Sequence, residues 1–245
     1  MKKLLVTALL AGLVSTTYAA DHGAQHWNYT EAEHWGDSSE DFALCKLGKS
    51  QAPINIDTKS TQKSDLPTIK INYKSSTTEI VNNGHTIQIN LADAGSATVP
   101  GGEYKIVQFH FHTPSEEEIN GKHFAMVAHL VHENSTGNLD VIAVLFKKGK
   151  ENAALKEIFE KMPHEEGKVA LEKPFDIATI LPKSMDYYAF TGSLTTPPCS
   201  EGVAWQVLKQ PVELSAEQIS AFQKIFKMNA RPVQPLNGRK VQESS

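Results

Sequence analysis

Two histidines one residue apart, His110 and His112, lie in an apolar stretch of the chain and are its residues best suited to chemistry. Successive side chains of a β-strand point to opposite faces, so these two imidazoles share a face. A second strand-like run, residues 126–132, carries His129. Three neutral imidazoles from neighbouring strands can hold a zinc ion and leave one coordination position open, as catalytic zinc sites do. The pattern therefore predicts a zinc site that turns water into a nucleophile.

Spacing alone leaves the third ligand open, because His129 and His132 both lie in the second run but on opposite faces of it. Isolated histidines in apolar strands are more often core residues, but a buried unpaired imidazole is costly, and a pair two residues apart favours metal binding. Zinc-bound histidines usually donate their second ring N–H to an acceptor, and Gln108 lies on the correct face to accept it. Glu116 follows the histidine strand and could serve the site or be solvated. We interpret Glu117 and Glu118 as surface charge.

Composition and the N-terminus indicate an exported globular protein. The chain has 245 residues, 40% hydrophobic and 21% charged, with a net charge of −4 and no basic stripe, which argues against nucleic acid as a partner. Lys2 and Lys3 precede an apolar run and small residues, which predicts a signal peptide over residues 1–19. Residues 20–245 then form one domain, with no later stretch apolar and long enough to cross a membrane. The expected location is the periplasm, with free secretion as the alternative.

Cys45 and Cys199 are the two cysteines of the chain, and an oxidising compartment predicts a disulfide between them. Cys199 ends the stretch 192–199, in which two prolines follow Thr195 and Thr196. We expect a rigid loop with one cis X-Pro bond, whose disulfide would fix where the threonine hydroxyls point. Taken alone, the stretch is an ordinary proline-stiffened turn.

The periodicity of the chain predicts an α+β fold dominated by antiparallel strands, because short Gly/Asn turns separate the strand signals. Strands are expected at 68–73, 79–83, 86–91, 104–112, 125–132 and 141–147. Surface helices are expected at 152–162 and at 215–227, the second beginning with a capping box at Ser215. His85 lies in a predicted turn, and an exposed imidazole can carry protons near neutral pH.

Four segments taken together, 108–116, 128–132, 192–199 and 229–235, resemble the α-class carbonic anhydrases, and the exported bacterial ones most of all. The likeness runs from about Trp27 to Val241. It implies a large central twisted, mainly antiparallel sheet with a few surface helices and zinc (Zn2+) at the base of a conical cleft. It also implies reversible hydration of carbon dioxide to bicarbonate and a proton, inhibition by sulfonamides and anions, and a homodimer as in many exported relatives.

The resemblance assigns roles to individual residues. His110, His112 and His129 match the zinc ligands, which favours His129 over His132. Thr195 matches the residue whose hydroxyl accepts a hydrogen bond from the zinc-bound hydroxide and donates one to a carboxylate, and Glu116 matches that carboxylate. The remaining matches are His85 as proton shuttle, Tyr29 and Gln88 as polar cleft residues, Thr196 beside the substrate, and Val131, Val141, Leu194 and Trp205 as the apolar wall that receives CO2.

One departure from the family bears on the metal. Relatives usually carry a Glu two residues before the third ligand, where it accepts that ligand's ring N–H, but Val127 occupies the position here. Either water, a backbone carbonyl or another side chain replaces this Glu, or His129 is held less firmly. Because loss of such an acceptor weakens metal binding, we expect weaker zinc retention than in relatives. Ala230, where relatives have Asn, is given no functional weight. Val127 is also the one sequence feature that favours the alternative function, a non-catalytic zinc-binding or interaction protein on the same fold.

Overall fold

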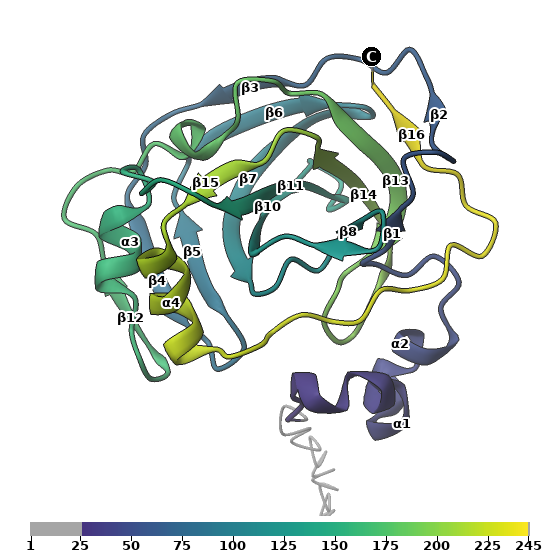
Figure 1. The fold of residues 1–245 in the computed structure, drawn as a ribbon, viewed down its shortest axis with the longest axis horizontal. Coiled ribbons are helices and arrows are strands. Elements are labelled where there is room, and N and C mark those ends of the chain that lie inside the picture. Colours follow the sequence, from purple (N-terminus) through teal and green to yellow (C-terminus); the bar gives the residue numbers. More distant parts are fainter. Residues whose placement is uncertain (1–25, 245) are drawn as a thin grey trace, which may run out of the picture.

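The computed structural model describes residues 26–244, so the predicted signal peptide lies outside the described residues. A large twisted β-sheet forms the body of the domain, and the helices are short (Figure 1). The described strands are β1 (Asn55–Ile56), β2 (Gln62–Lys63), β3 (Lys70–Tyr73), β4 (Thr78–Asn82), β5 (Ile87–Leu91), β6 (Gly95–Val99), β7 (Gly102–His112), β8 (Glu118–Ile119), β9 (Lys122–His123), β10 (Met126–Glu133), β11 (Leu139–Lys148), β12 (Gly167–Ala170), β13 (Tyr187–Ser193), β14 (Glu201–Leu208), β15 (Val212–Leu214) and β16 (Gln242–Glu243). The described helices are η1 (Tyr29–His34), α1 (Trp35–Ser38), η2 (Glu40–Phe42), α2 (Leu44–Leu47), α3 (Lys156–Lys161), η3 (Ile177–Ile180) and α4 (Ala216–Ile225).

The strands of the large sheet follow the order β12-β4-β5-β7-β10-β11-β14-β13-β16-β2, with β6 also pairing β7, β3 pairing β6, and β15 pairing β11. Most neighbours are antiparallel, as predicted, but β11 pairs parallel with β14 and β15, and β16 pairs parallel with β2. A small second sheet has the order β1-β8-β9, in which β8 runs parallel to β1. This small sheet matters for the site because it fixes the segment that follows β7.

Apolar side chains cover both faces of the large sheet, in two separate clusters. Phe109 and Phe111 alternate with the histidines of β7 and point to the larger cluster, where Phe111 contacts Phe159 of α3 and Phe222 of α4. In Figure 1 these two helices lie together against one part of the sheet. Fully burying a phenylalanine contributes about 1.5–3 kcal/mol, so this face anchors β7. The smaller cluster lies on the histidine face.

The α4 helix begins as its sequence predicts. Ser215 Oγ accepts from the backbone N–H of Gln218, and Gln218 Oε1 accepts from the backbone N–H of Ser215, which completes the capping box. The helix predicted at 152–162 is shorter than expected, Lys156–Lys161, because Asn152 makes a turn with its side chain accepting from Ala154 N and Leu155 N. Among the helices between residues 26 and 244, none combines the length and hydrophobicity that a membrane crossing requires.

His132 and Asp140 lie opposite each other on β10 and β11, on the face away from the three predicted ligands. Both side chains are fully buried, and His132 Nε2 lies 2.6 Å from the hydroxyl of Tyr73. Burial raises the pKa of Asp140 to about 7, although the nearby side chain of Gln206 acts in the opposite direction. Of the two histidines that competed as third ligand, His132 is therefore a core residue.

We expect the Asp140→Asn variant to become progressively more stable than wild type as the pH rises. The carboxyl of Asp140 has a folded-state pKa above its unfolded value of about 3.9, so the protonated form is favoured by folding and stability is lost as pH rises through about 7. Between pH 5.5 and 8.5 the difference in the free energy of unfolding between variant and wild type should widen by about 2 kcal/mol. Urea denaturation of both zinc-loaded proteins at the two pH values measures this difference. Parallel pH dependences would show that Asp140 is not buried as a neutral acid.

Candidate metal centre and active-site cleft

The register between β7 and β10 places the three predicted ligands next to one another. His129 lies directly across from His110, and Val127 lies across from His112. A register shift after Val131 comes beyond the histidines and leaves their pairing intact. One ring nitrogen from each of His110, His112 and His129 lies within 4.8 Å of the others. Strand alternation and strand pairing together thus create the tripod that the sequence predicted.

Each imidazole uses its other ring nitrogen to contact an acceptor, which fixes the ring and its tautomer. His110 Nδ1 lies 2.9 Å from Gln108 Oε1, as predicted. His112 Nδ1 lies 2.7 Å from the backbone oxygen of Asn229. We assign the proton in each case to the nitrogen facing the oxygen, which leaves the converging nitrogen with a free lone pair.

One expectation about the carboxylates is wrong. Glu117 is not surface charge: its side chain is fully buried, and its Oε1 lies 2.9 Å from Nε2 of His129. Another side chain thus occupies the place left by Val127, and the basis for expecting weak zinc retention is removed. Glu117 was missed because a run of three acids has the pattern of solvated charge, whereas the fold buries both Glu116 and Glu117 just before β8 begins. Glu118 pairs with His123 at 3.1 Å and is partly exposed, as expected.

The donor set fits zinc, which accepts imidazole nitrogen readily. Burial lowers the pKa of His110 to about 3 and that of His112 well below its ordinary value, so both rings are neutral. Burial also lowers the pKa of His129, but the carboxylates of Glu117 and Glu116 outweigh it and raise the pKa overall. Nε2 of His112 is buried without a hydrogen-bond partner among the described residues. A nitrogen in that state is explained by a metal ion, which three histidines would leave with an open position.

Glu116 connects the tripod to the threonine loop. Its side chain is fully buried, and its Oε1 accepts a hydrogen bond from the backbone N–H of Arg231 at 2.8 Å. Burial raises the pKa of Glu116 to about 7, while His129, the N–H of Arg231 and the nearby side chain of Thr195 favour the charged form. A cation held by the histidines would favour that form further. The structure thus brings Thr195 and Glu116 close together, as the proposed arrangement requires.

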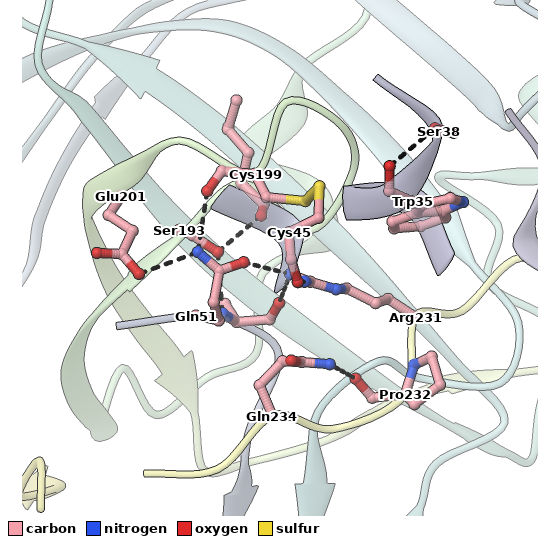
Figure 2. Close-up of a disulfide and its surroundings, with 12 residues drawn as sticks. Trp35, Ser38, Cys45, Gln51, Ser193, Cys199, Glu201, Arg231, Pro232 and Gln234 are labelled. Carbon is pink, nitrogen blue, oxygen red and sulfur yellow. Dashed lines mark hydrogen bonds between the residues drawn. A yellow bond between two sulfur atoms is a disulfide. The ribbon is translucent and has the colours of Figure 1, made fainter. Parts of the chain in front are cut away.

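The disulfide between Cys45 and Cys199 is confirmed, with an S–S distance of 2.05 Å, and the peptide bond between Pro197 and Pro198 is cis, as expected of one bond in this loop. Figure 2 shows how the guanidinium of Arg231 reaches the disulfide region: it donates to the backbone oxygen of Cys45 and to the side chain of Gln51.

Gln51 extends this network to the far side of the disulfide. Its amide donates to the backbone oxygen of Cys199 at 3.0 Å and to Glu201 at 3.0 Å. The guanidinium of Arg231 thus braces the loop that carries Thr195, while the backbone of the same residue holds Glu116. Arg231 and Asn229, to which the sequence analysis assigned no role at the site, are neighbours of the site. Both act partly through backbone atoms, which leave no mark in a side-chain pattern.

A cavity of about 260 Å3 opens onto the three histidines. Its walls contain every residue that the resemblance placed in the cleft, apart from Glu116, which is buried. Polar and apolar side chains both line the cavity. The polar members are Tyr29, His85, Gln88, Gln108, Thr195 and Thr196, and the apolar ones predicted are Val131, Val141, Leu194 and Trp205.

His85 lies at the cavity wall and is half-buried. The turn before it is closed by Asn83, whose side-chain oxygen accepts from His85 N at 3.0 Å and from Thr86 N at 2.9 Å. The imidazole stacks on Trp27 with ring centroids 3.8 Å apart, a contact that the sequence did not predict. Burial lowers the pKa of His85, the positive charge of His26 lowers it further, and Glu166 partly opposes them.

Comparison with known proteins agrees with this site. A family model described as eukaryotic-type carbonic anhydrase matches residues 30–245. A carbonic anhydrase of Neisseria gonorrhoeae is 48% identical, with 97% of this chain and 96% of that protein covered. Among solved structures, the α-carbonic anhydrase of Thermovibrio ammonificans in complex with sulfanilamide has a TM-score of 0.87 at 47% identity, covering 90% of this chain and all (100%) of the other.

A further solved structure, the α-carbonic anhydrase of Photobacterium profundum, has a TM-score of 0.84 at 43% identity, covering 89% of this chain and all (100%) of the other. The match of the family model extends over nearly the whole described chain, and the tripod, its acceptors and the cleft lie within it. The chain therefore belongs to the α-class, or eukaryotic-type, carbonic anhydrases, zinc enzymes that reversibly hydrate carbon dioxide.

Proposed function

We propose that this protein hydrates CO2 at the tripod, with Thr195 and Glu116 orienting the attacking oxygen and His85 carrying the proton away. The observation that carries the proposal is the convergence of three buried imidazole nitrogens, within 4.8 Å of one another, at the wall of a cavity. When bound there, zinc lowers the pKa of a water molecule to about 7, a figure known from carbonic anhydrase itself, and so supplies a nucleophile near neutral pH.

Thr195 and Glu116 restrict the direction of attack. A hydrogen bond between Thr195 and Glu116 would have the threonine hydroxyl as donor, because a carboxylate can only accept. The oxygen of Thr195 would then have only acceptor capacity left for the nucleophile, which would orient that nucleophile toward the substrate. Holding reactants in a near-attack geometry in this way is a large source of rate enhancement.

The apolar residues that line the cavity are suited to bind an uncharged substrate. Val131, Val141 and Trp205 are largely buried and belong to the smaller apolar cluster, and partly buried Leu194 packs against it. Carbon dioxide carries no charge and no hydrogen-bond donor, so it gains from leaving water for such a surface. Bicarbonate carries a charge, and next to this apolar surface it lacks the favourable hydration that water gives. This difference favours its release. Thr196 also lines the cavity, next to Thr195 along the chain.

We expect the His85→Ala variant to lower kcat by on the order of 10–100-fold in weak buffer, because a positioned imidazole would no longer remove the proton. Hydration itself does not use His85, so kcat/KM should stay unchanged. Stopped-flow CO2 hydration with and without added imidazole measures both quantities, and imidazole should restore kcat. His34→Ala, which removes an exposed imidazole away from the cavity, is the control. An equal fall in kcat and kcat/KM would contradict the role of shuttle.

We also propose export to the periplasm after cleavage behind Ala19, one folded domain over residues 20–245, and assembly as a homodimer. The disulfide between Cys45 and Cys199 supports export, because such bonds persist in oxidising compartments. The relative from Thermovibrio ammonificans was solved with the inhibitor sulfanilamide. Because its chain aligns with 90% of this one, we propose that sulfonamides also bind in this cleft.

Metal analysis together with a pH-indicator assay of CO2 hydration tests the proposed function. The purified protein should contain zinc and accelerate hydration, and a sulfonamide should abolish the acceleration. A zinc-loaded protein without activity would indicate the alternative, a non-catalytic zinc-binding protein. Val127 was the one feature that favoured this alternative. It no longer does so, because Glu117 supplies the acceptor for His129 that a valine cannot.

A further inference from the structure

Glu117 is a buried acid whose carboxylate faces the third zinc ligand. Its Oε1 and Oε2 lie 2.9 and 3.3 Å from Nε2 of His129, and both side chains are buried. One ring nitrogen of His129 lies within 4.8 Å of those of the other two histidines, and with Nε2 facing Glu117 we assign this role to Nδ1. A hydrogen bond from Nε2–H to Glu117 therefore selects the tautomer that offers its lone pair to the metal, and the negative charge strengthens that nitrogen as a donor.

The backbone around Glu117 is held in place from several sides. The backbone oxygen of Glu117 accepts from Ser115 Oγ at 2.7 Å, and that hydroxyl in turn accepts from Phe124 N at 2.9 Å. The next residue, Glu118, donates its N–H to the backbone oxygen of Ile54 at 3.2 Å, where β8 begins its pairing with β1. The carboxylate is thus presented by a braced loop and not by the strand that carries His129.

Val127 explains why the loop must supply this group. It shares a face of β10 with His129, is fully buried, and packs in the smaller apolar cluster, so it can accept no hydrogen bond. Relatives of the family usually have a Glu at this position, as noted above. The chain therefore has an apolar residue on the strand and a carboxylate on the loop, both directed to the surroundings of one imidazole.

We propose that Glu117 is the positioning residue of the third zinc ligand, and that positions 117 and 127 are interchangeable sources of one carboxylate. The inference rests on the proposed zinc site. It predicts that the effect of a Glu at position 127 depends on position 117. With Glu117 present, the N–H of His129 already has its acceptor, so a buried carboxylate at position 127 gains no hydrogen bond there and is repelled by Glu117. With Glu117 removed, the same substitution restores the contact.

Zinc release to a chelator tests this, followed with a chromogenic indicator on zinc-loaded protein. Zinc content of the wild type is measured first, so that absence of the metal site is distinguished from failure of the role given to Glu117. The Glu117→Gln variant should release zinc about 10–100-fold faster, a range established partly on carbonic anhydrase. Glu118→Gln, which changes the adjacent, partly exposed acid, is the matched control and should release zinc at the wild-type rate.

The double variant Glu117→Val with Val127→Glu should return the release rate close to wild type, whereas Glu117→Val alone should be fast. A role of Glu117 limited to general stability would not be rescued by moving the carboxylate. Wild-type release from Glu117→Gln, or a double variant as fast as Glu117→Val, overturns the proposal. Should the Glu117 variants fail to fold, Val127→Glu alone decides: unchanged or faster release supports the proposal, and slower release overturns it.

Discussion

The His129→Ala variant is expected to lose zinc and to fall at least about 10³-fold in CO2 hydration. A metal ion supplies several kcal/mol of transition-state stabilisation, and each 1.36 kcal/mol corresponds to a factor of ten in rate. Removing this ring also leaves the carboxylate of Glu117 buried without the partner that lies 2.9 Å away. Metal analysis by mass spectrometry and stopped-flow hydration assays measure the two losses together.

His132 provides the control for this experiment, because it lies on the same strand but faces the larger core, next to Tyr73. The His132→Gln variant should lose stability, since it disturbs a buried contact, yet keep its zinc and its hydration rate. Equal zinc loss from both variants would mean that the strand as a whole, and not one face of it, holds the metal. Full activity of His129→Ala would remove the assigned ligand set.

The Thr195→Val variant is expected to lower kcat/KM by about 10²-fold, the size of effect that a misplaced reacting group produces. Valine keeps the shape of threonine but neither donates to Glu116 nor accepts from the nucleophile. Zinc content should stay unchanged, because Thr195 contacts Glu116 and not the outer nitrogens of the ligands. The stopped-flow hydration assay and metal analysis measure both properties.

Thr191→Val is the matched control, since Thr191 is exposed on β13. It makes the same chemical change outside the cavity and should leave hydration unaltered. A Thr195→Val rate close to wild type would show that the hydroxyl does not orient the attacking oxygen. A parallel loss of zinc would show instead that the threonine loop supports the metal centre as a whole.

Local pattern was sufficient for much of this protein. Alternation along β7 placed His110 and His112 on one face and Phe109 and Phe111 on the other, and the structure has them so. The capping box at Ser215 predicted where α4 begins. These features depend on the direction of side chains within one element, which the backbone geometry of that element fixes by itself.

The acceptors of the ligand rings also differ in whether the local sequence predicts them. Gln108 was predicted for His110 because both lie on one strand, two residues apart. The acceptor of His112 is the backbone oxygen of Asn229, and any residue type could supply that atom. The guanidinium and backbone of Arg231, which connect the disulfide region to Glu116, belong to the same distant segment. Partners that lie 115 or more residues away leave no periodic signal.

The amino-acid sequence by itself was enough to assign His110 and His112 from their spacing and the cysteine pair from the expected compartment. The third histidine, and the acid and threonine beside the site, were assigned with help from resemblance. Which carboxylate serves His129 was decided by the tertiary structure alone. Glu117 lies in a run of three acids that has every sign of a solvated surface, and Val127 indicated a missing acceptor. The fold buries the middle acid just before β8 begins and places it beside His129. A buried N–H requires an acceptor, and the fold, not the local pattern, determines which acceptor is within reach.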